Sequence, residues 1–359
     1  MREFGFAIVG GGVIAPFHAR AIAELPNARL VAVADSIAER AQQRGEEFGV
    51  DHYTDLAPML ARPDVDVVSV CVPSGLHAAI GVQAAQAGKH VVVEKPIDVS
   101  LDNADALLEA VRQAGVKLTV ISQHRFDEGV QELRGLIDAG RLGRLILGDA
   151  IVKWYRTQQY YESGDWRGTW DLDGGGSLMN QGVHYVDVLR WLMGPVDRVF
   201  ARTATAGHRI EVEDIALALL RFRNGAVGVL EASTAVFPGF SERVEITGSE
   251  GTVILDSGRM LVRALKDEQG EARDYGSKLR LTGGQDAAGA SDPAAIPHVS
   301  HRRQLADFLD AIENDRQPLV TGEEARQTLE LILAVYESAR SDREIELPLK
   351  TPTAGGHGG

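Results

Sequence analysis

Residues 4–15 read FGFAIVGGGVIA, an apolar run that passes directly into three glycines. The apolar run predicts a buried β-strand, and the glycines predict a tight turn into a helix. Small residues at the first, third and sixth positions of such a turn let backbone amides at the helix N-terminus approach a pyrophosphate. Gly10, Gly12 and Ala15 occupy these positions. Because glycine-rich turns are common, an ordinary loop remains the alternative interpretation of this stretch taken alone.

An acidic residue at the end of the next predicted strand favours the dinucleotide interpretation. Residues 30–34 are apolar and are followed by Asp35, twenty positions after Ala15. A carboxylate at this place hydrogen-bonds the adenosine ribose hydroxyls and repels a 2′-phosphate. The first arginine after Asp35 is Arg40, on the next predicted helix, from which it could still reach a phosphate. We therefore expect NAD, with NADP as the less favoured cofactor.

A lysine ends the apolar run of a later strand. A buried strand leads into the turn at residues 73–77 (PSGLH). After the next predicted helix, the strand at residues 90–94 ends at Glu94, and Lys95 follows it directly. Open α/β folds bind their ligands at the carboxyl edge of the parallel sheet. An ammonium group at that edge is desolvated and oriented, so we expect Lys95 to take part in chemistry.

Strands and helices alternate from residue 1 to about residue 122, which is typical of a parallel sheet. The strands expected in this half are residues 4–9, 30–34, 67–72, 90–94 and 117–121. Beyond residue 140 the strands become longer, alternate with period two and are joined by short turns, which indicates antiparallel hairpins. They are expected at residues 145–155, 199–204, 215–222, 226–233, 242–247 and 252–256, with further helices at 128–138, 303–314 and 323–338.

The chain is thus predicted to be an α/β protein with two domains. We expect an NAD-binding Rossmann-type parallel sheet in residues 1–123 and a substrate-binding α+β domain with a large, mainly antiparallel sheet in residues 124–350. Residues 266–298 are poor in large apolar side chains and predict a surface loop, and residues 351–359 predict a disordered tail. Since one face of the antiparallel sheet needs cover, we expect a homodimer or homotetramer that forms through this sheet.

Composition narrows the class of ligand. The 359 residues carry a net charge of −14, which disfavours nucleic acid, because binding it requires clustered lysine and arginine. Small molecules are the expected ligands, and we expect no metal ion. Cys71 is the single cysteine, so no disulfide can form within the chain and a cytoplasmic location is favoured. The sequence shows no signal peptide and no apolar run long enough to cross a bilayer, so no membrane partner is expected.

Taken together, these motifs and the run 174–187 (GGGSLMNQGVHYVD) resemble the Gfo/Idh/MocA oxidoreductase family over nearly the whole chain. The resemblance implies that Lys95 lies beside the nicotinamide and the reacting hydroxyl, and that Glu94 helps to hold the nicotinamide ribose. It also implies that the Lys95–Pro96 peptide bond can be cis. The residues expected to contact the cofactor are Gly10, Gly12, Val13, Ile14, Asp35, Pro73, Ser74, His77, Glu94 and Lys95.

The chemistry of alcohol oxidation assigns roles to two side chains. Oxidising a secondary alcohol with NAD requires a base for the hydroxyl proton and a positive group that stabilises the developing alkoxide. An imidazole is a suitable base near neutral pH, and a nearby ammonium lowers its pKa by charge repulsion. We therefore expect His184 to act as the base and Lys95 to assist it. The alternative for His184 is an ordinary, partly buried histidine.

Two neighbours of His184 leave alternatives open. Family members often carry an aspartate four residues before this histidine, but Asn180 stands there, and an amide cannot accept a proton. The two-acid arrangement of the family is therefore in doubt in this chain. Asn180 either hydrogen-bonds the substrate or caps a helix predicted over residues 181–193. Asp187, one helical turn after His184, either orients the imidazole or is an exposed helical acid.

An aromatic and cationic segment predicts the substrate wall. Residues 153–171 contain Trp154, Tyr155, Tyr160, Tyr161, Trp166 and Trp170, together with Arg156 and Arg167. Flat rings beside cations suit a sugar, whose CH faces stack on aromatic rings while hydroxyl, carboxylate or phosphate groups meet arginine. The alternative is that the rings pack the sheet or an oligomer interface. Gln123, His124 and Arg125 follow the last parallel strand and are secondary candidates for the same pocket.

We conclude from the sequence that the chain is an NAD-dependent dehydrogenase that acts on a ring hydroxyl of a sugar, cyclitol or sugar conjugate. The run 180–182 and the aromatic loop are similar to those of nucleotide-sugar 3-dehydrogenases, such as those acting on UDP-N-acetylglucosaminuronic acid, while inositol dehydrogenases share the general plan. Two alternatives remain open. One is an NAD-dependent glycoside hydrolase that oxidises C3 transiently, and the other is a catalytically silent dinucleotide sensor.

Overall fold

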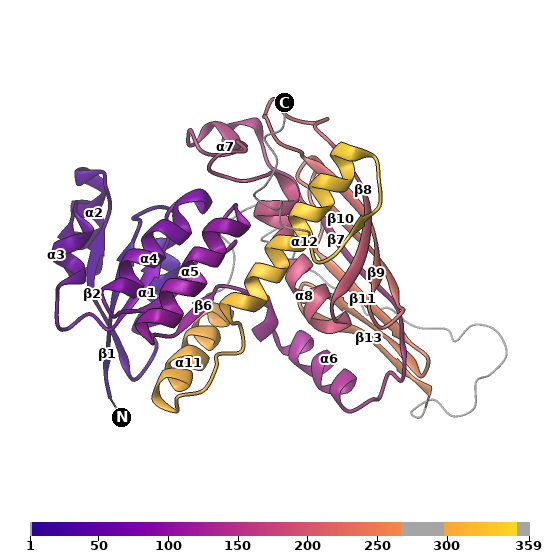
Figure 1. Cartoon of the computed structure of the whole chain (residues 1–359), viewed down its shortest axis with the longest axis horizontal. Helices are drawn as coiled ribbons and strands as arrows, with labels where there is room; N and C mark the ends of the chain where they lie inside the picture. The colour runs from indigo at the N-terminus through magenta and orange to yellow at the C-terminus, as the bar shows by residue number, and fades with distance from the viewer. Residues whose placement is uncertain (1, 267–297, 350–359) are drawn as a thin grey trace, which may run out of the picture.

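The computed structural model describes residues 2–266 and 298–349 of the chain, and these residues form two β-sheets that are joined and covered by helices (Figure 1). The predicted surface loop at residues 266–298 lies outside the described residues except at its two ends, and so does the tail at residues 351–359. The α/β architecture expected from the sequence is confirmed.

The first sheet is parallel and has six strands in the order β3-β2-β1-β4-β5-β6. Its strands are β1 (Phe4–Val9), β2 (Ala28–Ala34), β3 (Asp51–Tyr53), β4 (Val67–Val70), β5 (His90–Val93) and β6 (Leu118–Val120). Helices alternate with them: α1 (Ala15–Ala23), α2 (Ala38–Phe48), α3 (Leu56–Leu60), α4 (His77–Gln86) and α5 (Leu101–Ala114). The strand order reverses between β1 and β4, which is where doubly wound folds bind ligands at the carboxyl edge.

The second sheet has eight strands in the order β13-β12-β11-β7-β10-β9-β8-β14. Its strands are β7 (Leu145–Lys153), β8 (Val196–Ala204), β9 (Ile215–Phe222), β10 (Val227–Ser233), β11 (Arg243–Gly248), β12 (Gly251–Asp256), β13 (Arg259–Leu265) and β14 (Ile345–Glu346). All neighbouring strands are antiparallel except β7 and β10, which run parallel. The helices of this part are α6 (Glu128–Asp138), α7 (Gln158–Glu162) and α8 (Val183–Met193), with a π-helical segment at Ser177–Gly182.

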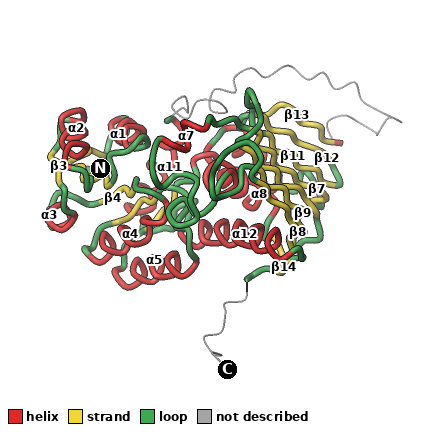
Figure 2. The backbone as a smooth tube through the Cα atoms, turned by 90° about the horizontal axis from the view of Figure 1, so that it is seen from above, coloured by secondary structure: helices red, strands yellow, loops and turns green. Residues whose placement is uncertain are grey.

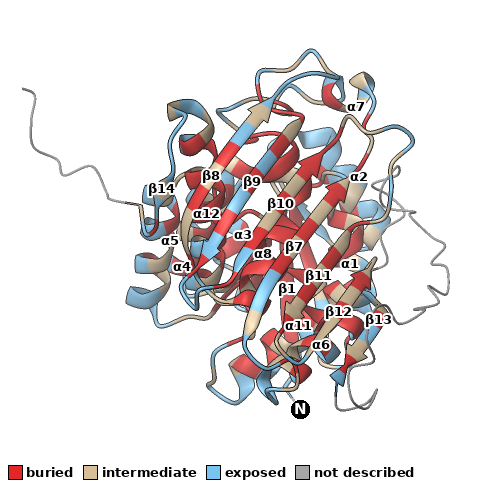
Figure 3. Ribbon diagram, turned by 90° about the vertical axis from the view of Figure 1, so that its right-hand side faces the viewer, coloured by how far each residue is buried: buried red, intermediate tan, exposed pale blue. Residues whose placement is uncertain are grey.

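One face of the second sheet is covered and the other is open. Helices α8 and α12 (Gly322–Ser341) lie on the covered face, where Leu220 and Leu230 are buried. Figure 3 looks onto the other face, where buried and exposed residues alternate along β9 and no helix lies in front of the strands. Leu217 and Leu219 of β9 are exposed on this face. This alternation is the pattern of a half-buried antiparallel sheet.

Helix α11 (Val299–Glu313) returns from the second half of the chain to the first sheet. Alternate residues of β1 face two different layers, and the layer that contains Phe6 and Ile8 also contains Phe308 and Leu309 of α11. Gln304 fixes the position of this helix by donating to the Val120 carbonyl at 2.8 Å. In Figure 1 and Figure 2, α11 accordingly lies against the N-terminal half, while α12 reaches across to the second sheet.

Most predicted elements are present, with ends shifted by a few residues. The strand predicted at residues 215–222 and the helix predicted at residues 128–138 have the bounds that were expected. Strands β3, β13 and β14, helices α3 and α7, and the π-helical segment were not predicted. Two of the three residues of β3 are exposed, so this strand carries little hydrophobic signal.

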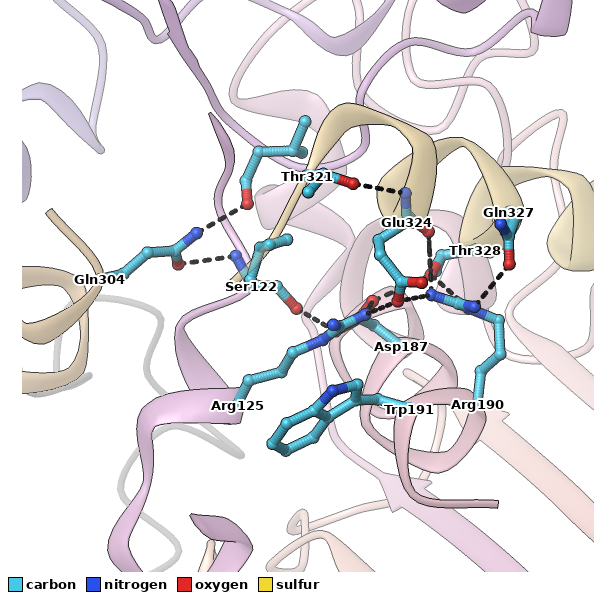
Figure 4. A network of polar contacts seen from close by, with 12 residues as sticks. Ser122, Arg125, Asp187, Arg190, Trp191, Gln304, Thr321, Glu324, Gln327 and Thr328 are labelled. Atoms are coloured by element: carbon cyan, nitrogen blue, oxygen red, sulfur yellow. Dashed lines mark hydrogen bonds and ion pairs between the residues drawn. The ribbon is translucent and has the colours of Figure 1, made fainter. Parts of the chain in front are cut away.

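A buried network of charges joins the two halves of the molecule (Figure 4). Arg125 is fully buried and donates two hydrogen bonds of 2.6 Å to Asp187 of α8 and one of 3.1 Å to Glu324 of α12. Ser122 and Thr328 also donate to the Asp187 carboxylate. Burial alone would raise the pKa of Asp187, but the Arg125 guanidinium outweighs it and the pKa lies below its usual value.

Asp187 therefore fits neither of the two sequence interpretations. It is buried rather than an exposed helical acid, and its oxygens accept from Arg125, Ser122 and Thr328 rather than from His184. The helical position alone could not show this, because the partners come from residues about 60 and 140 positions away in the sequence.

Replacing Asp187 with asparagine is expected to lower the free energy of unfolding by about 3 kcal/mol, because the buried Arg125 guanidinium loses its two shorter charged hydrogen bonds and keeps only the longer one to Glu324. The matched control is Asp105→Asn, which breaks the more exposed ion pair between Asp105 and Arg326, and this change is expected to cost less than about 1 kcal/mol. Urea unfolding followed by circular dichroism measures both. Equal losses in the two variants would show that the buried network does not hold the halves together.

Candidate active site

The glycine turn after β1 is shaped for a ligand. Gly10 has φ +100°, and a Cβ there would lie 2.4 Å from the carbonyl oxygen of Cys71, so only glycine fits. A Cβ at Gly12 would meet nothing within 4 Å, which leaves the backbone open to an approaching group. Val13 is exposed, and Ile14, which precedes α1, offers no side-chain cap to the first amides of the helix. These features suit a pyrophosphate at the start of α1.

Asp35 lies against this turn from the end of β2. Its carboxylate accepts from the Gly11 amide at 2.8 Å and from the Ile37 amide at 2.9 Å. Arg40 lies 3.4 Å from the same carboxylate, and Arg44 donates to the Gly11 carbonyl at 2.9 Å. The carboxylate thus lies next to the phosphate-binding turn, which is the place that a ribose-binding acid occupies in dinucleotide folds.

The turn after β4 packs against the lysine segment. Ser74 is buried, and the ring nitrogens of His77 lie 2.6 Å from the Pro96 carbonyl oxygen and 2.8 Å from the Val72 carbonyl oxygen. Burial lowers the pKa of His77, although hydrogen bonds to the two carbonyl oxygens oppose this shift. The imidazole therefore ties the end of β4 to the Lys95–Pro96 bond, which is cis as the resemblance implied.

Glu94 is held by two histidines from distant segments. Its carboxylate lies 2.7 Å from His18 Nε2 of α1 and 3.8 Å from His301 Nε2 of α11, and it accepts from the Lys95 amide at 3.1 Å. Burial alone would lower the pKa of His18, but Cys71 and Glu94 raise it to about 10. The ligand atoms of His18, Glu94 and His301 all lie within 4.8 Å of one another, and His18 and Glu94 are directly hydrogen-bonded.

Lys95 and His184 border one small cavity, which is otherwise lined mainly by apolar residues such as Val120, Ile121 and Leu329. Both residues line it, Lys95 from the end of β5 and His184 from the first turn of α8. Burial lowers the pKa of Lys95, although neighbouring carboxylates oppose the shift. Burial also holds the pKa of His184 well below its usual value, and the charges of Lys95 and His124 add to this effect. A neutral imidazole thus lies near an ammonium group at the carboxyl edge of the parallel sheet.

Asn180 connects the two halves of the site. It lies inside the π-helical segment and not at the start of α8, which begins at Val183 after Gly182, so the helix-capping interpretation is wrong. The Lys95 ammonium donates to the Asn180 backbone carbonyl at 2.9 Å and to its side-chain oxygen at 3.3 Å. The Asn180 amide in turn donates to the buried carboxylate of Asp173 at 2.5 Å. Sequence reasoning missed Asp173, although its place directly before the three glycines was visible.

The glycines before Asn180 allow the π-helical segment to pack closely. A Cβ at Gly176 would lie 1.7 Å from the Glu213 carbonyl oxygen. The buried Glu213 carboxylate accepts from the amides of Gly176 and Leu178, each at 2.8 Å. Glu213 thereby anchors the start of the segment that carries Asn180 and His184.

Part of the aromatic segment gathers around two arginines. The Arg167 guanidinium lies 4.5 Å from the ring centres of both Tyr160 and Trp166, and it donates to the Tyr160 hydroxyl at 2.7 Å. Arg156 is buried and lies over the Trp154 and Tyr160 rings, at 5.0 and 5.5 Å. This group reaches the reacting centre through Gln181, which donates to the Tyr160 hydroxyl at 3.1 Å and to Asn180 Oδ1 at 3.4 Å.

Two known domain families match the chain, the first over the parallel sheet and the second over most of the second sheet. Residues 4–122 match the oxidoreductase family with an NAD-binding Rossmann fold, and residues 130–254 match the GFO/IDH/MocA C-terminal domain. The chain belongs to the Gfo/Idh/MocA oxidoreductase family. It is an NAD-dependent dehydrogenase of this family, as the sequence predicted.

Several characterised family members are similar over their full length. The WlbA dehydrogenase from Bordetella pertussis, solved in complex with NADH and UDP-GlcNAcA, is 34% identical with a TM-score of 0.84, covering 97% of this chain and 100% of that protein. A levoglucosan dehydrogenase, solved with NADH and L-sorbose, is 25% identical with a TM-score of 0.85, covering 97% and 100%. Myo-inositol 2-dehydrogenase from Thermotoga maritima is 27% identical over 95% of this chain and 97% of its own.

The remaining site residues predicted for this chain differ in their surroundings. Trp154 is buried and donates to Glu242 at 3.2 Å, so it packs the sheet as the alternative interpretation proposed. Arg125 donates to the Asp187 carboxylate, and His124 Nδ1 lies 2.7 Å from the Asp127 carboxylate. Gln123 is buried, and its side-chain oxygen has no hydrogen-bond partner among the described residues. Gln123 therefore stays a candidate, whereas Arg125 is a structural residue.

Replacing Asp35 with alanine is expected to weaken NADH binding by about 10- to 100-fold, because hydrogen bonds to a charged carboxylate contribute roughly 1.5–3 kcal/mol each. The preference for NAD over NADP is expected to fall as well, since the charge that repels a 2′-phosphate is lost. Fluorescence titration with NADH and NADPH measures both affinities, with Glu39→Ala on α2 as the control. An unchanged preference would exclude Asp35 as the discriminating residue.

Proposed function

We propose that this oxidoreductase transfers hydride between NAD and a ring secondary alcohol of a sugar, cyclitol or sugar conjugate. The observation that carries the proposal is that Lys95, at the carboxyl end of β5, hydrogen-bonds Asn180 and borders one small cavity together with His184. Bound NAD would accept the hydride from the alcohol carbon. The side chains of this chain would handle the hydroxyl proton and the charge on its oxygen.

The proposed division of labour follows from the surroundings of the two groups. Among the described residues no group hydrogen-bonds the buried His184 Nδ1, so this ring nitrogen is not held by another protein group, and the imidazole would take the hydroxyl proton. Two protons of the Lys95 ammonium are held by Asn180, which leaves the third to hydrogen-bond the substrate oxygen. As hydride leaves carbon, that hydrogen bond strengthens, because the oxygen gains negative charge. Asn180 is the third residue assigned to the reacting centre.

The cofactor and the substrate are assigned to opposite sides of this centre. On the NAD side we place Gly10, Gly12, Val13, Ile14, Asp35, Pro73, Ser74, His77, Glu94 and Lys95. On the substrate side we place Gln123, Arg156, Trp166, Arg167, Asn180 and His184. This division gives residues 1–123 the cofactor and residues 124–350 the substrate, with α11 packed back on the first sheet.

The arginine and aromatic group favours a substrate with both a ring and an anionic substituent. A pyranose stacks on Trp166 or Tyr160, while Arg156 and Arg167 meet a carboxylate or phosphate. The similarity to a dehydrogenase solved with UDP-GlcNAcA supports a sugar conjugate. The similarity to inositol dehydrogenases makes cyclitols the second group to test.

Replacing Lys95 with methionine is expected to lower the turnover number by at least about 100-fold, because the developing alkoxide loses its positive partner. NADH affinity is expected to change only a few-fold. The assay incubates the protein with NAD and a panel of cyclitols, sugars and UDP-sugars, and it follows the absorbance of NADH. Lys117→Met, just before β6 at the opposite edge of the sheet, is the matched control.

Two outcomes of this assay would overturn the proposal. Turnover that persists in Lys95→Met would remove the lysine from the reaction. Cleavage of a glycoside without net NADH would assign the chain to the NAD-dependent hydrolases, and NADH binding without any conversion would favour a sensor.

We further propose that the open face of the second sheet joins two or more copies of the chain. Leu217, Leu219 and Val227 are 45%, 61% and 50% exposed on adjacent strands, and burying them would remove apolar surface from water. Leu219→Lys is expected to shift the protein from a homodimer or homotetramer toward the monomer, as measured by light scattering coupled to size-exclusion chromatography. Val299→Lys on α11 is the control. A monomeric wild-type protein would contradict the proposal.

A further inference from the structure

The Asn180 side-chain amide lies between a buried carboxylate and the reactive lysine. Its nitrogen donates to Asp173 Oδ1 at 2.5 Å, and its oxygen lies 3.3 Å from Lys95 Nζ. The other Asp173 oxygen accepts from the Gly168 amide at 2.8 Å. Asp173 is 2% exposed, so its hydrogen-bond partners come from the protein. A continuous chain of hydrogen bonds thus runs from the carboxylate through the amide to the ammonium.

The carboxylate determines which way the amide faces. An ionised carboxylate only accepts hydrogen bonds, so the amide nitrogen must point to Asp173 and the amide oxygen to Lys95. The reverse orientation would direct two N–H groups at an ammonium and an oxygen at a carboxylate. Asp173 therefore keeps an acceptor in front of Lys95 without touching the lysine itself.

We propose that Asp173 is the acidic partner of Lys95 and acts through the Asn180 amide, which it orients. The inference rests on the proposed function, because it assigns a positioning residue to the same reacting centre. The negative charge near Asn180 comes from a loop residue seven positions earlier, and the Asn180 amide relays its effect to Lys95.

Several other charged groups around Lys95 also affect the pKa of its ammonium group. The carboxylates of Glu94 and Asp173 favour the charged lysine, while burial and the guanidinium groups of Arg167 and Arg156 disfavour it. His184 faces the same cavity as a neutral ring. Two carboxylates thus oppose two guanidinium groups, so removing either acid shifts the balance toward the uncharged amine.

The decisive experiment measures the pKa of Lys95 by ¹⁵N NMR of the lysine side chains in the full-length protein, with the signal assigned by its loss in Lys95→Met. In Asp173→Asn the amide at position 173 still accepts from Gly168, but Asn180 must turn and direct its N–H groups at Lys95. The pKa of Lys95 is expected to fall by about one unit, a tenfold change in its protonation equilibrium. Asp171→Asn, an exposed acid of the same loop, is the control and should leave it unchanged.

A double variant separates this role from a merely structural one. In Asp173→Asn with Asn180→Asp, every hydrogen bond of the chain can form, and the carboxylate at position 180 faces Lys95 directly. The pKa of Lys95 is expected to rise above that of the wild type. A Lys95 pKa that is unchanged in the single variant, or that falls in the double variant, would overturn the inference.

This readout does not require turnover. Failure of the proposed function would appear as no NADH formed by the wild type with any member of the substrate panel. Failure of the Asp173 assignment would appear in the lysine titration, even in a protein that oxidises its substrate.

Discussion

The hydrogen bonds from the Lys95 ammonium to Asn180 connect the two sheets at the reacting centre. Lys95 follows the end of β5 in the first sheet. Asn180 lies in the π-helical segment that leads into α8, which packs on the second sheet. A buried ammonium is costly unless its donors are satisfied. The two halves must therefore meet in one relative position, which also brings His184 to the cavity that Lys95 lines.

The same requirement explains why so many charged groups lie at this junction. Glu94 is paired with His18 and Asp187 with Arg125, in each case from distant parts of the chain, while Asp173 accepts from the Asn180 amide seven positions later. Breaking a buried ion pair leaves an uncompensated charge, so the Asp187–Arg125 pair disfavours other packings of α8 against the end of the first sheet. Pairing of buried charges therefore positions the site residues, while the hydrophobic core stabilises the fold around them.

Sequence patterns were sufficient where local chemistry alone decides the structure. The first sheet, apart from β3, could be predicted because its other strands are largely apolar and one of them leads into a glycine turn that only small residues allow. Lys95 and His184 stood out because each lies in a recognisable motif. Asp187 could not be assigned, since its partners lie on distant elements, and the contact of Asp173 with Asn180 depends on the path of the loop between them. The capping role predicted for Asn180 is wrong because a π-helical segment precedes α8. No local sequence pattern indicates that the helix begins with this wider turn.

The position of α11 affects how the protein is made. Phe308 and Leu309 belong to the same buried layer as Phe6 and Ile8 of the first strand, although some 300 residues separate them in synthesis. While the chain emerges from the ribosome, α1 covers part of that face, but the part beneath α11 stays uncovered until nearly the whole protein has been translated. The nucleotide-binding half is first in the sequence and among the last parts to complete its core, so chaperones that shield apolar surface would act on it during most of translation.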